Sequence, residues 1–183
     1  MVRAGPIPVL LLILLWASSV QTAGAAARVQ VQSAPEVSVK ASYLVRFAAF
    51  VEWPARAFAT PQSPVILCVV GRDPFGTNLT RAAAGQSAYG RPLVVRRPST
   101  AAAAVGCHIL YVGRDGADVR RGLGTRPGLL VVTDAAVAPE RGMIHFVLSD
   151  ARVRFHIDQR AATASGLSIS SRLLNLALTV QGV

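Results

Sequence analysis

Two short segments repeat a pattern of residues that could bind an anion. CVVGRDPFG (residues 68–76) and LYVGRDG (residues 110–116) each place Gly-Arg-Asp directly after an apolar run. If the two runs are neighbouring strands of an open α/β sheet, both turns lie at its carboxyl edge, where ligands bind and helix N-termini favour anions. One interpretation is therefore a small anionic ligand, a nucleotide included, held by residues of these turns: Arg72, Asp73, Gly76 and Arg114.

A purely structural interpretation explains the same turns without a ligand. Glycine permits the tight bend, aspartate caps the helix that follows, and the arginines are solvated. The chain also has no glycine-rich phosphate-binding fingerprint. Both interpretations remain open.

The two cysteines, Cys68 and Cys107, could form a disulfide or remain buried thiols. In an oxidising compartment the disulfide is the default expectation, and closing this loop would contribute about 4 kcal/mol. However, Cys68 lies three residues before Gly71, whereas Cys107 lies six before Gly113. Level turns would then offset the cysteines by about 10 Å on opposite sides of the sheet, beyond the reach of roughly 7 Å that a disulfide allows. A staggered register or a bulge would restore the bond.

Other residues that support catalysis or metal binding are sparse. His108, His145 and His156 are too dispersed for a zinc site, so we expect a surface pair of His145 and His156 across a hairpin, and no metal. The serines between residues 165 and 171 flank predicted helix starts, and no nucleophile-elbow pattern accompanies them. The sequence predicts no active site and no cofactor, and we expect that the protein is not an enzyme.

The elements that would position these residues alternate between helix and strand. Residues 38–51 predict a helix with an apolar stripe from Val39 to Phe50, which Pro54 ends. Trp53 at this helix end either caps the core or presents its ring to a partner. Four continuous apolar runs then predict strands that are covered on both faces, with helices between them. The strands are residues 65–70, 93–96, 108–112 and 129–133, and the helices are residues 75–84 and 115–123.

The pattern changes after residue 142. Residues 143–148 and 152–157 alternate in polarity and predict an antiparallel hairpin that turns Arg152 and Arg154 outward. Asp158 would cap a short helix, and residues 169–178 predict a last one. The expected fold class is α/β: a single three-layer domain, with a mostly parallel sheet of about six strands, a C-terminal antiparallel β-hairpin, and helices on both faces.

The N-terminus has the pattern of a secretion signal. Arg3 supplies a positive charge, residues 9–16 are continuously apolar, and small residues follow. Eight apolar residues fall far short of the roughly 20 that span a bilayer, so we expect a cleaved signal peptide, with an uncleaved anchor as the alternative. The expected organisation is a signal peptide at residues 1–27, a flexible lead-in at 28–37 and one domain at 38–183, located in the periplasm.

The chain is basic, with a net charge of +10, and of its 19 basic residues all but Lys40 are arginine. This composition indicates either a surface for an acidic partner, anionic lipid or nucleotide, or simply a GC-rich genome. The arginines are scattered without interleaved aromatic residues, and the protein is expected to be exported. We therefore expect no nucleic-acid partner.

Five segments, taken in order, resemble the YfiR-type family of periplasmic regulators. They are KASYLVRFAAFVEWP (40–54), VILCVVGRDPFG (65–76), GRPLVVRR (90–97), CHILYVG (107–113) and GMIHFVLSDARVRFHIDQRAATASGLSISSRLLNLA (142–177). The resemblance implies a non-enzymatic repressor of an inner-membrane diguanylate cyclase, and hence of cyclic di-GMP signalling and biofilm formation. It also favours the Cys68–Cys107 disulfide. The family's best-described members carry further cysteines in the final hairpin, whereas residues 143–157 have none.

The implied partner is an inner-membrane diguanylate cyclase or another membrane sensor protein, and the resemblance also allows an outer-membrane lipoprotein and a homodimer. Two surfaces are candidates for the contact: the outward hairpin face with Arg152 and Arg154, and the helix end with Trp53. The alternative function is a periplasmic sensor or binding protein for a small anion or nucleotide, serving a sensor kinase or transporter. It would use the Gly-Arg-Asp turns.

Overall fold

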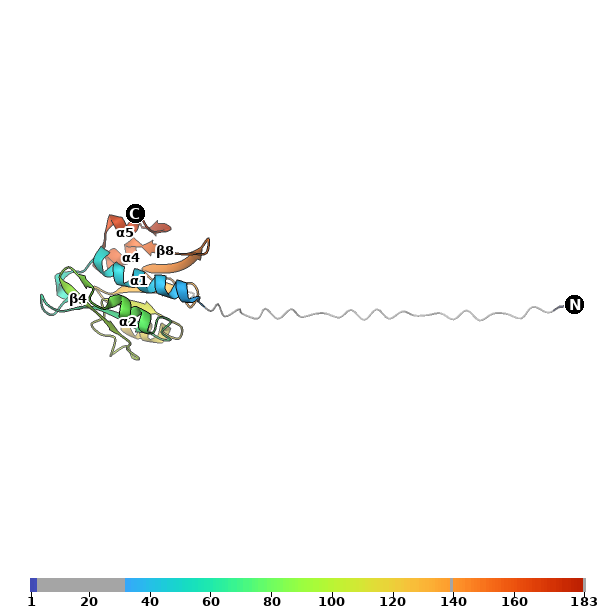
Figure 1. The fold of residues 1–183 in the computed structure, drawn as a ribbon, viewed down its shortest axis with the longest axis horizontal. Coiled ribbons are helices and arrows are strands. Elements are labelled where there is room, and N and C mark those ends of the chain that lie inside the picture. The colour runs from blue at the N-terminus through green and yellow to red at the C-terminus, as the bar shows by residue number, and fades with distance from the viewer. Residues whose placement is uncertain (3–31, 139, 183) are drawn as a thin grey trace.

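The centre of the fold is an eight-stranded, mostly parallel sheet (Figure 1). The computed structural model describes residues 1–2, 32–138 and 140–182, and its strand order is β10-β8-β7-β6-β5-β2-β4-β3. In chain order these strands are β2 (Val65–Val70), β3 (Ser87–Ala88), β4 (Arg91–Arg96), β5 (Ile109–Val112), β6 (Leu130–Asp134), β7 (Ile144–Ser149), β8 (Arg152–Asp158) and β10 (Thr179–Gln181). Only the β3–β4 and β7–β8 pairs of this sheet are antiparallel.

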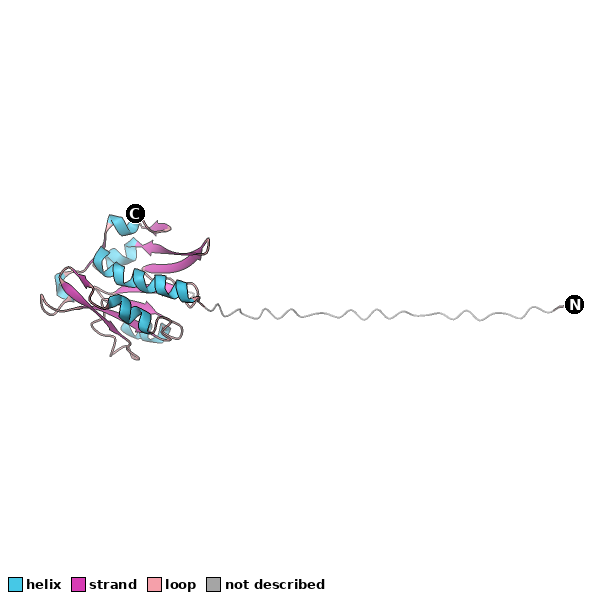
Figure 2. Cartoon of the chain, in the orientation of Figure 1, coloured by secondary structure: helices cyan, strands magenta, loops and turns pink. Residues whose placement is uncertain are grey.

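Helices cover both faces of the sheet, which confirms the predicted three-layer α/β class. On one face α1 (Ala34–Phe50) and α2 (Thr77–Ala83) lie side by side, as Figure 2 shows, and α4 (Gln159–Ala164) and α5 (Ser171–Leu174) add to the same apolar cluster. The opposite face carries a second cluster, to which α3 (Ala117–Leu123) and the loop before β5 contribute. A second, two-stranded sheet pairs β1 (Val51–Glu52) with β9 (Ser168–Ile169), and η1 (Ala55–Ala57) is a short 3-10 turn.

The first helix differs from its prediction in its start and in its buried face. It begins at Ala34, inside the expected lead-in, because Ser33 accepts a hydrogen bond from the Glu36 amide and so caps it. Val39 is 43% exposed, so its place in the predicted core stripe is wrong. The buried side of the helix instead runs through small and aliphatic residues, the aromatic Phe47 and one charged residue, Lys40.

The C-terminal helix predicted for residues 169–178 is also wrong. Only Ser171–Leu174 is helical, and the chain then forms β10, which pairs in parallel with the outer edge of β8. Edge pairing satisfies backbone groups that a longer helix would have satisfied internally. The strands β3 and β10 are two and three residues long, too short for a periodic signal, and they raise the sheet from about six strands to eight.

The structure contains the Cys68–Cys107 disulfide, with the two Cα atoms 5.9 Å apart. The two Gly-Arg-Asp turns are level, since Val70 pairs with Val112, but the offset expected for the cysteines is wrong. Cys107 precedes β5 in a turn, where its amide donates to the Ala104 carbonyl, so it does not extend the strand. The turn brings its sulfur over the sheet face to which Cys68 points, inside the second apolar cluster.

The expected signal peptide, residues 1–27, lies outside the described residues except for Met1 and Val2. Across the described ranges, no helix has both the length and the apolar character needed to cross a membrane.

Glycines let the backbones of the two Gly-Arg-Asp turns touch. The Arg72 amide donates to the Arg114 carbonyl at 2.7 Å. Gly71 has a φ of +75°, and a Cβ added there would lie 2.3 Å from the Arg114 carbonyl oxygen. Neither the conformation nor the space at this position suits a side chain.

We expect Gly71→Ala to lower the free energy of unfolding by about 3 kcal/mol, because a left-handed alanine costs roughly 1 kcal/mol and overpacking about 2 kcal/mol. Gly85→Ala is the matched control: Gly85 has a φ of +70° but no atom within 4 Å of an added Cβ. Gly85→Ala should lower the free energy of unfolding by the conformational part alone, roughly 1 kcal/mol. Urea unfolding measures both, and equal losses would refute the steric argument.

Candidate partner-binding surface

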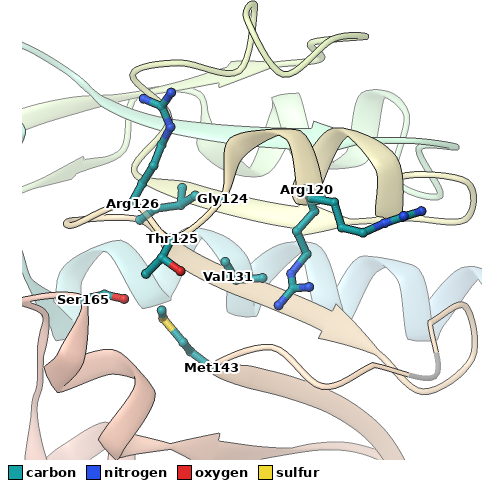
Figure 3. Close-up of a pocket in the computed structure, with 9 residues that line it drawn as sticks. Arg120, Gly124, Thr125, Arg126, Val131, Met143 and Ser165 are labelled. Carbon is teal, nitrogen blue, oxygen red and sulfur yellow. The ribbon is translucent and has the colours of Figure 1, made fainter.

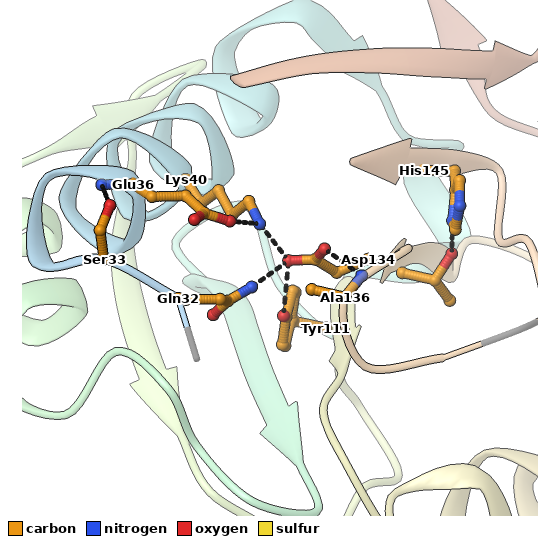
Figure 4. A network of polar contacts seen from close by, with 9 residues as sticks. Gln32, Ser33, Glu36, Lys40, Tyr111, Asp134, Ala136 and His145 are labelled. Atoms are coloured by element: carbon orange, nitrogen blue, oxygen red, sulfur yellow. Dashed lines mark hydrogen bonds and ion pairs between the residues drawn. The ribbon is translucent and has the colours of Figure 1, made fainter. Parts of the chain in front are cut away.

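A buried ion pair attaches α1 to the sheet (Figure 4). Lys40 Nζ lies 2.6 Å from Asp134 Oδ2, and both side chains are 1% exposed. The same ammonium donates to Glu36 Oε1 at 2.5 Å. A buried charge is tolerated only when it is paired and hydrogen-bonded, so these contacts determine where the first turns of α1 sit relative to the carboxyl end of β6.

Neutral donors complete the hydrogen bonding of the Asp134 carboxylate. Gln32 Nε2 and the Tyr111 hydroxyl donate to its Oδ2 at 2.6 and 3.3 Å, and the Ala136 amide donates to Oδ1 at 3.0 Å. Burial raises the pKa of the Tyr111 phenol far above its usual range, and the Asp134 charge raises it further. The Tyr111 hydroxyl therefore stays protonated, and remains a hydrogen-bond donor, well above neutral pH.

Sequence reasoning missed this cluster, although one signal was available. Lys40 is the only lysine in a chain that otherwise uses arginine for every basic position. A compact ammonium on a flexible stem fits a narrow buried site that a planar guanidinium would not. The single lysine in the composition was therefore a signal that Lys40 occupies a special, buried position.

An open groove lies between the first half of α1 and the β7–β8 hairpin. We call it the hairpin groove; its volume is about 750 Å³, and it is lined by Ser33, Pro35, Glu36, Val39, Tyr43, Leu148, Ala151, Arg152, Val153, Arg154 and Leu176. Three of its apolar side chains are strongly exposed, Val39 at 43%, Leu148 at 49% and Leu176 at 55%. Clustered exposed apolar residues with a polar rim mark interaction sites.

The rim of the hairpin groove is cationic. Arg152 is exposed and Arg154 half-buried, as the alternating pattern predicted, while Val153 and Phe155 point into the core. In the described ranges no carboxylate lies within salt-bridge distance of either arginine. Glu36 is the acidic residue of the lining, and Lys40 already binds it. The free charge on this surface is therefore positive.

Trp53, the second candidate for the partner surface, belongs to a different cluster. It is half-buried and packs edge-on against the His108 ring, on which Phe58 stacks at 4.5 Å. It lines a separate cavity of about 370 Å³ with Phe58 and Arg91, among others, and that cavity shares no lining residue with the hairpin groove. The structure therefore does not bring Trp53 together with Arg152 and Arg154.

The Gly-Arg-Asp turns are adjacent as predicted, and an arginine that sequence reasoning missed binds two of the candidate residues. Arg97 donates to Asp73 Oδ2 at 2.7 Å and to the Gly76 carbonyl at 2.6 Å. The other Asp73 oxygen accepts from the Phe75 amide, so Asp73 shapes the turn, while Gly76 occupies the cap position of α2. Anion binding by Arg72 and Arg114 stays a prediction.

His145 and His156 face each other across the hairpin, in the register expected, but the expected surface pair is wrong for His145, which is only 5% exposed. His145 is buried and Thr133 Oγ1 lies 2.8 Å from its Nδ1, while Thr179 Oγ1 lies 2.6 Å from Nδ1 of His156. Burial lowers the pKa of both imidazoles, and the nearby Arg141 lowers it further. The described part of the chain holds no group of three or more His, Cys, Asp or Glu suited to a metal.

His108 joins β2 to η1 as a neutral imidazole. Its Nδ1 accepts from the Ile66 amide, and its Nε2 lies 3.0 Å from the Ala57 carbonyl, which requires a donor. Burial lowers the pKa of His108; the Ala57 hydrogen bond acts in the opposite direction, and Arg91 lowers the pKa further. Protonation would remove the acceptor that the Ile66 amide uses.

These features together describe an α/β domain with an open apolar groove and a cationic rim. The chain belongs to the YfiR/HmsC-like family (DUF4154), whose model matches residues 37–178. No curated protein matches the chain. The family is in general regulatory and non-enzymatic, and it suggests a periplasmic regulator of a diguanylate cyclase.

Replacing Lys40 should destabilise the protein strongly. Lys40→Met leaves the Asp134 charge buried without its partner, and we expect a loss of about 3–5 kcal/mol. The double variant Lys40→Met/Asp134→Asn should recover a large part of the loss. Arg97→Met is the control: it removes an ion pair in which the arginine is 39% exposed and should cost at most about 1 kcal/mol. Urea unfolding decides, and equal losses for Lys40→Met and Arg97→Met would contradict the account.

The histidines make stability depend on pH. Because the pKa values of His108, His145 and His156 are lower in the folded chain than the unfolded value of 6.5, the unfolded state binds more protons below that pH. Their full contribution is present above pH 6.5, and the free energy of unfolding falls as the pH drops from 7.5 to 5.5. His108→Gln should reduce this slope. Urea unfolding at a series of pH values tests it; stability that rises on acidification would contradict it.

Proposed function

We propose that the protein is a non-enzymatic periplasmic regulator that binds the periplasmic part of an inner-membrane diguanylate cyclase and represses cyclic di-GMP synthesis. The hairpin groove is the contact surface. The observation that carries the proposal is the combination of three exposed apolar side chains with a cationic rim that no carboxylate of the described ranges neutralises. Membership of the YfiR/HmsC-like family supports the regulatory role.

The groove favours one kind of partner segment. Val39, Leu148 and Leu176 offer an apolar centre, and Arg152 and Arg154 offer guanidinium groups at its edge. Interfaces of this kind place large apolar side chains at the centre and complementary charges at the rim. The fitting partner is an amphipathic segment of the cyclase, with apolar side chains flanked by carboxylates.

Repression requires a preference between two states of the cyclase. A regulator shifts a conformational equilibrium only by the difference between its affinities for the two conformations. The protein would therefore bind the inactive conformation of the periplasmic part more tightly, and the change would cross the membrane within the cyclase itself.

Export is part of this proposal. Residues 1–27 act as a cleaved signal peptide, and the YfiR-like domain, which the family model matches over residues 37–178, is exported to the periplasm. A homodimer and an outer-membrane lipoprotein remain further partners that the family resemblance predicts.

Cellular cyclic di-GMP in a deletion strain tests the function. We expect the level to rise several-fold on deletion and to return to normal when the wild-type chain is supplied. Leu148→Glu should fail to restore it, because a carboxylate would then occupy the apolar centre of the groove. Val105→Glu is the matched control, since Val105 is 48% exposed outside the groove and Leu148 is 49% exposed within it.

Immunoblots of periplasmic extracts would establish that both variants are exported and equally abundant. A level unchanged by deletion would overturn the repressor function. If Leu148→Glu restored the wild-type level fully, the repressor function would stand, but the hairpin groove would be excluded as the surface that contacts the cyclase.

A further inference from the structure

An arginine-lined cavity of about 320 Å³ lies between α3, β6 and the end of α4 (Figure 3). Arg120 and Arg121 line it from α3, Thr125 from the following loop and Ser165 from the end of α4, and Val131 and Met143 contribute its apolar side. In Figure 3 the hydroxyls of Thr125 and Ser165 turn toward the space beside Met143. The cavity has no lining residue in common with the hairpin groove.

One buried donor of this cavity lacks an acceptor. Arg120 Nε is buried and unpaired within the described part of the chain. Ser165, which also lines the cavity, is only 4% exposed, and its backbone is held in place because its carbonyl accepts from the Gly128 amide at 2.7 Å. A buried donor without an acceptor costs about 1–3 kcal/mol, so its presence at this cavity needs an explanation.

The arginine charges are only partly neutralised at the cavity mouth. Arg120 Nη1 lies 3.1 Å from Glu140 Oε2, but that glutamate is 66% exposed. Arg121 pairs with Asp118, and both side chains are mostly exposed. Such pairs are weak and solvent-screened, so an anion that enters the cavity competes readily for the guanidinium groups.

We propose that this cavity binds a small organic anion, a carboxylate or a phosphate monoester with a compact apolar body. Arg120 and the Ser165 hydroxyl donate to the oxyanion, Thr125 adds a third donor, and Val131 and Met143 contact the apolar part. The volume is at the lower end of the range of roughly 300–1,000 Å³ typical of ligand pockets. The site is separate from the Gly-Arg-Asp turns and does not depend on the proposed repressor function.

Isothermal titration calorimetry and thermal shift of the mature protein test the proposal, with phenyl phosphate and benzoate as probes and neutral benzamide as the control. We expect both anions to bind with a Kd below about 1 mM, benzamide at least tenfold more weakly, and anion affinity to fall as salt is added. Absence of anion binding at about 10 mM probe, or equal binding of benzamide, would overturn it.

Substitutions locate the site. Arg120→Gln should weaken anion binding at least tenfold and Ser165→Ala about threefold, which is 0.7 kcal/mol. Glu140→Gln removes the competing carboxylate and should tighten it. Arg72→Gln and Arg114→Gln are the controls and should leave affinity unchanged. Loss of binding in these two variants, with Arg120→Gln unaffected, would place the ligand at the Gly-Arg-Asp turns and refute the cavity site.

Discussion

The contact between Lys40 and Asp134 constrains more of this structure than any other single interaction. An ammonium and a carboxylate that are each 1% exposed must stay paired, because separating them would leave two unsolvated charges in the interior. The pair therefore allows one placement of α1 on the sheet. That helix is one wall of the hairpin groove, and Glu36, which lines the groove, also binds Lys40. Core electrostatics and the proposed binding surface thus share a side chain.

The Cys68–Cys107 disulfide fixes a segment on the other face of the sheet, as the Lys40–Asp134 pair fixes α1 on the first. Cys68 lies in the central strand β2, and Cys107 in the turn before β5, so the bond holds the preceding loop over the second apolar cluster. With both faces covered, β2 and β5 can be almost wholly apolar, whereas the residues of β8 alternate between buried and exposed. The half-exposed hairpin is consequently a part of the sheet that is free to meet a partner.

The sequence predicted the secondary structure correctly where burial produces a regular pattern of apolar and polar residues. Continuous apolar runs predicted β2 and β5, and alternation predicted the hairpin and its outward Arg152 and Arg154. The Lys40–Asp134 pair produces no such pattern, because its members lie 94 residues apart and each is a single polar residue. The same holds for Cys107, whose position depends on a turn, and for Arg97, whose partners lie in another loop. Local sequence patterns could not predict contacts between single residues that lie far apart in the chain.

The central claim is that the hairpin groove contacts a membrane diguanylate cyclase. The most direct measurement is photo-crosslinking in living cells, with a photoreactive amino acid at position 148 and, as the control, at position 105, two sites of nearly equal exposure. The account predicts a crosslinked product at position 148 alone, which mass spectrometry identifies as a diguanylate cyclase. The same product at both positions, or none with a cyclase at position 148, would contradict it.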